Sequence, residues 1–252
     1  MTTPTLGGIL RRGALAGVAA GVVASVVAFA VVEPVIARAL AVEEARSAGT
    51  PAEEPLVGRA MQVAGGMVAA VAVAVCLALV LAVVFATVRH RLPARTDFGR
   101  AVLLAFLGFV SFSLVPALKY PANPPAVGDP DTVGARTAQY LSLIAAGVAI
   151  AWLAVLVRQV LVERGWSAPL AVTGGVLAGV AGYLALMLIW PGGTVEIPAD
   201  VPARLIWDFR VASLAELTAM WATMGAVLGL LLTPRTGGPA ARADGSTSAT
   251  GL

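Results

Sequence analysis

The sequence is poor in charged residues, which make up 12% of its 252 residues, whereas 59% are hydrophobic. Soluble domains usually carry about 25% charged residues, and a chain of this length still needs a wetted surface in water. A lipid bilayer removes that need. The shortage of charge therefore excludes an ordinary soluble domain and indicates a membrane protein.

Residues that perform most enzyme and metal chemistry are also scarce. Cys76 is the only cysteine, which excludes an internal disulfide, and the only histidine, His90, lies between two arginines that disfavour a bound metal ion. Lys119 is the only lysine and lies in a proline-rich segment, so a Walker-type phosphate loop is absent. The sequence thus predicts neither an enzyme nor an ATP-driven motor.

Nucleic acid is not an expected partner, although the net charge is +3. The basic residues lie at the ends of apolar runs instead of forming a patch, which is a membrane-topology pattern. One side of the predicted membrane carries ten cations and three acids, and the other carries seven cations and ten acids. By the positive-inside rule, both termini are predicted to be cytoplasmic.

Six apolar runs are long enough to cross a bilayer, which takes about 20 residues. They cover residues 13–32, 61–88, 101–118, 137–157, 165–195 and 211–232. The predicted fold is all-α, a polytopic membrane helix bundle of about six transmembrane helices within residues 1–234. Residues 235–252 contain little hydrophobic content and are predicted to form a disordered cytoplasmic tail.

Prolines suggest where helices end or bend. Pro34 and Pro191 are predicted to mark helix ends, and Pro116 is predicted to kink the third span. The segment 35–47 has no proline or glycine and mixes apolar with charged residues, which is typical of a short interfacial helix. The first apolar run is longer than a signal-peptide core, so it is predicted to be a retained helix.

Small residues recur every four positions on several spans. Gly13, Gly17 and Gly21, which we call the glycine face, would form a flat surface that allows close helix packing. Gly175 and Gly179 have the same spacing, as do Gly225 and Gly229, although a chain rich in Ala and Gly also produces such spacings by chance.

The segment 119–136 is the most unusual part of the sequence. Its prolines make it stiff and rich in carbonyl acceptors, and Asn123, Asp129 and Asp131 could add oxygen ligands or an ion-attracting mouth. The alternative is a rigid loop that caps the bundle. The predicted structural residues of this loop are Lys119, Tyr120, Pro121, Pro124, Pro125, Gly128, Gly134 and Arg136, together with Arg210.

Further acids could line an ion path. Glu33, Glu43 and Glu44 follow the first span and could collect divalent cations, or could simply be solvated. Asp208, before the last span, is a further ion-path candidate.

Glu216 is the only acid inside a predicted span, about 12 Å along the helix from Asp208. An intramembrane carboxylate is costly and should face the bundle interior with a partner or a pathway. Arg210 is a nearby candidate partner, and a structural polar contact is the alternative reading.

The proline-rich segment also resembles a known family. Residues 119–128 read KYPANPPAVG and residues 131–137 read DTVGART, which is similar to the signature loop of the CbtA family. The stretches EPVI (33–36), LAVEEAR (40–46) and DFR (208–210) resemble that family as well.

The resemblance implies a cobalt transporter subunit of the bacterial cytoplasmic membrane, connected with cobalamin supply and with a small one-helix partner, CbtB. Co²⁺ would then be the transported ion, and membrane lipids the surroundings. Relatives carry several histidines in the first outer loop, but residues 41–59 have none. Because Co²⁺ favours imidazole nitrogen alongside oxygen, the metal ligands stay unknown, and a weak oxygen-only site or one completed by a partner is expected.

Two hypotheses about function follow. The leading one is a membrane subunit of a divalent-cation transporter, with cobalt as the cation. The alternative is a non-transporting membrane scaffold that binds a small partner helix through the glycine face.

Overall fold

A computed structural model describes residues 5–47, 57–125, 127, 133–192 and 197–234. In these residues the regular structure is entirely helical. The elements are α1 (Leu6–Val27), the π segment η1 (Ala28–Val32), α2 (Glu33–Arg46), α3 (Arg59–Val88), the 3₁₀ turn η2 (Arg89–Arg91), α4 (Asp97–Phe109), the π segment η3 (Val110–Leu114), α5 (Val115–Lys119), α6 (Val133–Glu163), α7 (Ala168–Ile189) and α8 (Ala203–Leu232).

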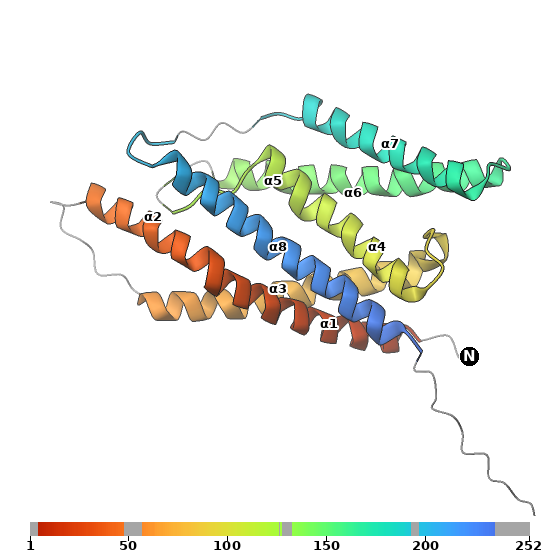
Figure 1. Ribbon diagram of the computed structural model, residues 1–252, viewed down its shortest axis with the longest axis horizontal. Coiled ribbons are helices and arrows are strands. Elements are labelled where there is room, and N and C mark those ends of the chain that lie inside the picture. Colours follow the sequence, from red (N-terminus) through yellow and green to blue (C-terminus); the bar gives the residue numbers. More distant parts are fainter. Residues whose placement is uncertain (1–4, 48–56, 126, 128–132, 193–196, 235–252) are drawn as a thin grey trace, which may run out of the picture.

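Six helical stretches in this part of the chain are long and apolar enough to cross a membrane, which confirms the predicted all-α bundle. The start of α1 and the end of α8 lie at the same end of the molecule (Figure 1). Which side of the membrane that end faces stays a prediction. The predicted tail, residues 235–252, lies outside the described residues.

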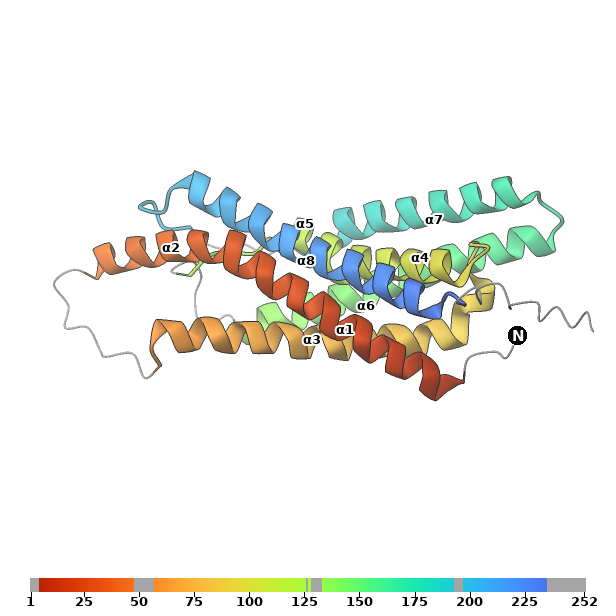
Figure 2. The same cartoon turned by 60° about the horizontal axis from the view of Figure 1, so that its bottom comes forward.

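The helices form two groups. In the larger group, α1 packs against α3 and α8, and α8 packs against α4. The hairpin of α6 and α7 lies beside this group and joins it mainly through η3 and α5 (Figures 1 and 2). Phe85, Met224 and Leu228 are fully buried in the core of the larger group. Leu188 and Ile189 on the hairpin are more than 80% exposed, as expected of side chains that contact lipid.

The first span is longer than predicted, because Pro34 does not end it. The helix predicted over 35–47 is present as α2, but it continues the first span without a break, because residues Leu6–Arg46 form one helical stretch of 41 residues. A proline lacks a backbone N–H and its ring crowds the carbonyl four residues earlier. The π segment Ala28–Val32 ends two positions before Pro34, and a π turn widens the helix enough to accommodate that ring.

The same arrangement occurs at Pro116. The π segment Val110–Leu114 precedes it, and the helix continues as Val115–Lys119. Pro191, in contrast, follows the end of α7 at Ile189, which confirms the predicted helix end there.

The glycine face packs against α3 of the same chain. A Cβ at Gly17 would lie 2.6 Å from the Val75 Cα, and a Cβ at Gly21 would lie 2.5 Å from the Val71 Cα. Only glycine fits at that backbone separation. The scaffold hypothesis assigned this face to a partner helix; the structure contradicts that assignment, because α3 already covers it.

The other two glycine pairs also join helices within the chain. Gly175 and Gly179 lie against Ala154 of α6, and Gly225 and Gly229 lie against Ala105 and Phe98 of α4. Three helix pairs, α1 with α3, α6 with α7 and α4 with α8, therefore contact each other through small residues spaced four apart.

Candidate functional site

Three ion pairs tie the first helical stretch to its neighbours at the α2 end of the bundle. Arg59 donates to Glu33. The Nη2 of Arg38 lies 3.0 Å from Oδ2 of Asp208. Because an arginine neutralises each of these carboxylates, Glu33 and Asp208 become available to a passing cation only if that arginine moves away.

The third pair joins Arg46 at the end of α2 to Asp200, just before α8. The Arg46 Nε and Nη2 atoms donate to the two oxygens of the Asp200 carboxylate at 2.8 and 3.0 Å. These hydrogen bonds hold the pKa of Asp200 below its usual range. A depressed carboxylate pKa stabilises the folded arrangement above the ordinary aspartate pKa of about 3.9, and that contribution is lost as the pH falls through the lower, folded-state value.

We therefore predict that acidification loosens the end of α2. Lowering the pH from 6 to 3 should increase the hydrogen exchange of the last turn of α2, after correction for intrinsic exchange rates. Asp200→Asn should show the faster exchange already at pH 6 and lose much of the pH dependence. Asp97→Asn, at the opposite end of the bundle, is the control. Equal pH dependence in the wild type and in Asp200→Asn would show that the Arg46–Asp200 pair does not hold the end of α2.

The beginning of the proline-rich segment is fastened to α7 and α8. Lys119 Nζ donates to the Met187 carbonyl oxygen at 2.8 Å, and Tyr120 Oη donates to the Pro191 carbonyl oxygen at 2.8 Å. Arg210 of α8 donates to the Asn123 Oδ1 at 3.1 Å and to the Ala122 carbonyl oxygen.

These bonds change the expected roles of two residues. The predicted contact between Arg210 and Glu216 does not occur, because residues six apart on a helix point in different directions and Arg210 turns to the loop instead. The Asn123 side-chain oxygen accepts from Arg210, so it is not a free ligand.

The other predicted loop residues differ in burial and in position. Pro124 is fully buried, whereas Gly134 has open space around it at the start of α6. Pro121 and Pro125 lie in the described irregular segment, and Arg136 lies in the first turn of α6. Gly128, Asp129 and Asp131 lie outside the described residues.

Glu43 and Glu44 lie near the end of α2 and are both exposed. They are not brought together with the other predicted acids into one cluster. Among the residues that the structure describes, no three His, Cys, Asp or Glu side chains gather closely enough to hold a metal ion.

Glu216 lies near the middle of α8. It is half-buried in α8, and its neighbours one turn away on either side, Ala212 and Met220, are both buried. Ala212 belongs to the apolar cluster of α2 and the α8 start, and Met220 belongs to the main core. The described residues supply Glu216 with no ion pair or hydrogen bond. A carboxylate at this depth must therefore hold a proton or meet a cation.

The sequence did not reveal the polar contacts among the spans. The Trp221 Nε1 donates to Ser113 Oγ at 3.0 Å, and Ser111 Oγ lies 2.9 Å from the Tyr183 hydroxyl, which itself bonds the Gly147 carbonyl oxygen. The paired serines before Pro116 are the one sequence signal that could have pointed to them. These bonds satisfy polar groups inside the bundle, join η3 to α8 through Ser113 and join η3 to the α6–α7 hairpin through Ser111.

Six membrane-length helices, three close glycine contacts and lipid-facing apolar side chains define a multi-pass α-helical membrane protein. The family model described as probable cobalt transporter subunit (CbtA) matches residues 6–233, nearly the whole chain. The chain therefore belongs to the CbtA family. Neither a curated protein nor a solved structure matches it.

Proposed function

We propose that this protein is the membrane subunit of a transporter that carries Co²⁺ across the bacterial cytoplasmic membrane, in connection with cobalamin supply. Family membership supports the transporter role. The observation that carries the mechanism is Glu216, an acid inside a membrane span with no partner in the described residues. Such residues mark ion pathways in membrane proteins because a buried charge is kept only where it is used.

The exposed acids at the α2 end would raise the local concentration of divalent cations. Glu43 and Glu44 are solvent-exposed there, and Glu216 would neutralise part of the ion's charge farther along the path. No ATP-binding loop occurs in the sequence, so the membrane potential is the proposed driving force. A potential of 100 mV is worth about 2.3 kcal/mol for each elementary charge moved.

A second subunit is part of the proposal. The family is described as a transporter subunit, and the described residues hold no three-ligand cluster. A one-helix, CbtB-like partner would complete the Co²⁺ site. It would dock away from the glycine face, which α3 covers.

The test is uptake of radiolabelled Co²⁺ into proteoliposomes that contain the purified chain, with and without an imposed inside-negative potential. We expect saturable uptake that increases with the potential, either with the chain alone or after co-reconstitution with the one-helix partner. Protein-free vesicles and vesicles with the partner alone are the controls. Uptake that equals these controls under both conditions would contradict the proposal and favour the non-transporting scaffold.

A further inference from the structure

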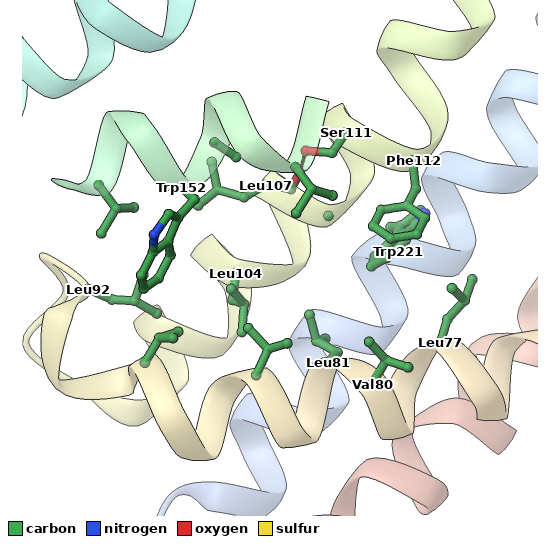
Figure 3. A pocket seen from close by; sticks show the side chains of 16 residues that line it. Leu77, Val80, Leu81, Leu92, Leu104, Leu107, Ser111, Phe112, Trp152 and Trp221 are labelled. Carbon is green, nitrogen blue, oxygen red and sulfur yellow. Dashed lines mark hydrogen bonds between the residues drawn. The ribbon is translucent and has the colours of Figure 1, made fainter. Parts of the chain in front are cut away.

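An apolar groove opens between the two helix groups at membrane depth. It has a volume of about 140 Å³ and is lined by side chains of α3, α4, η3 and α6, with Trp221 of α8 at one end (Figure 3). Leu92 and Trp152 lie at the other end (Figure 3). The lining residues Val80 and Val148 are 56% and 42% exposed, so the groove is open on its side toward the surrounding lipid.

The walls of the groove present almost only carbon. Of its three lining side chains that carry a polar atom, Ser111 bonds Tyr183 and the Leu107 carbonyl oxygen, and Trp221 Nε1 donates to Ser113. The third, Trp152, has its ring against the Arg91 guanidinium. A cavity of about 150 Å³ lined in this way stays dry and takes up an apolar molecule instead of water. The occupant is therefore apolar along this stretch.

The groove is long as well as apolar. Its lining on α3 runs from Leu77 to Val88, a length of about 16 Å at 1.5 Å per residue. A long, apolar space that opens toward lipid suits a hydrocarbon chain.

The end of the groove at Trp152 carries positive charge. The Arg91 guanidinium lies over the Trp152 ring at 5.6 Å from its centroid, and Arg158 Nη1 donates to the Arg91 carbonyl oxygen at 3.1 Å. Neither arginine forms an ion pair within the described part of the chain. The Arg158 Nε atom is buried and has no hydrogen-bond acceptor there.

We propose that this groove binds an anionic phospholipid, with one acyl chain along α3, α4 and α6 and the phosphate group at Arg91 and Arg158. A phosphate accepts two or more hydrogen bonds from guanidinium groups, and basic residues at a helix end attract anionic lipid head groups. The lipid would fill the space between the two helix groups and hold them together. This site is separate from the path proposed through Glu216 and does not depend on the transport function.

The test measures quenching of Trp152 and Trp221 by brominated lipids in nanodiscs. Replacing Trp166, Trp190 and Trp207 with phenylalanine leaves these two as the only tryptophans of the five in the sequence. Brominated phosphatidylglycerol, diluted into unlabelled phosphatidylcholine, should reach half-maximal quenching at a mole fraction on the order of tenfold lower than brominated phosphatidylcholine, because cations at the membrane surface favour the anionic lipid.

Two variants test the head-group and chain contacts separately. Arg91→Gln combined with Arg158→Gln should abolish the preference for phosphatidylglycerol, whereas Arg164→Gln, which removes an exposed cation nearby in the sequence, should leave it intact. Ala151→Phe, which places a ring in the groove, should reduce quenching by both lipids. If the arginine variant does not fold, the comparison of the two lipids in the wild type and the quenching in Ala151→Phe still test the proposal.

Equal quenching by the two lipids in the wild type would overturn the proposal, as would an unchanged preference in the arginine variant. Loss of a dimer in Ala151→Phe with unchanged quenching would also overturn it, because the groove would then be an interface between copies of this chain.

Discussion

Replacing Gly17 with isoleucine should prevent the chain from folding into a monodisperse bundle in detergent. A Cβ at this position would lie 2.6 Å from the Val75 Cα and 3.0 Å from the Ala74 carbonyl oxygen. Both are backbone atoms, so no rotamer change can relieve the overlap and α1 must move away from α3. Overpacking usually costs about 1–3 kcal/mol, and separating these helices would also remove their dispersion contacts. We expect a fall of roughly 5–10 °C in the thermal midpoint for any protein that still folds.

Gly65→Ile is the matched control for this prediction. Gly65 lies on α3, and a Cβ there would meet nothing within 4 Å. The same side chain added there should leave the midpoint and the elution profile close to those of the wild type. Gly17→Ala should fall between the two variants. If Gly17→Ile had the same thermal midpoint and elution profile as Gly65→Ile, that result would contradict the close contact between α1 and α3.

Replacing Glu216 with glutamine should reduce Co²⁺ uptake about tenfold or more while leaving the protein in the membrane. A charged side chain at the centre of a membrane helix costs about 2.5–3.5 kcal/mol on insertion scales, and a cation that meets the carboxylate offsets part of that cost. Losing even half of that from the stabilisation of a passing cation raises the barrier enough for about a tenfold slower rate. The glutamine has nearly the same shape, so the burial of Ala212 and Met220, one turn away on either side, should not change.

Two measurements distinguish a role of Glu216 in transport from a role in folding. Uptake and thermal midpoint are measured together for Glu216→Gln, Glu216→Asp and Glu44→Gln. Glu216→Asp keeps the charge and should restore part of the uptake, whereas Glu44→Gln removes an exposed acid and should have a small effect. Unchanged uptake in Glu216→Gln would remove this residue from the mechanism. A large fall in its thermal midpoint would instead indicate a structural role.

Much of the fold was predictable because membrane spans depend on composition over about 20 residues. The same physics explains the failure at Pro34. A proline at this position usually predicts a helix end, but a preceding π segment leaves room for its ring. The residue types at 28–32 do not predict that π segment. The spacing of glycines predicted packing faces but not their partners, since the pairing of α1 with α3 depends on how all the helices assemble.

The candidate site was less predictable than the fold. Residue types identified Glu33 and Asp208 as acids near the membrane, but their arginine partners come from other segments, 26 and 170 positions away. Arg210 was expected near Glu216 because of sequence proximity, whereas the direction of side chains around the helix sends it to Asn123. The groove between α3 and α6 has no sequence signal, because its walls look like any other apolar run.

The length of the first helical stretch has a mechanical consequence. Its 41 residues extend about 60 Å, roughly twice the thickness of the hydrocarbon core. The C-terminal half is fastened to α8 through Arg38 and to Asp200, just before α8, through Arg46. The N-terminal half is closely packed on α3. A helix of this length amplifies small tilts, because a rotation of about 5° at its N-terminal end displaces its other end by about 5 Å. A rearrangement of α1 inside the bilayer would thus be transmitted through α2 to the start of α8.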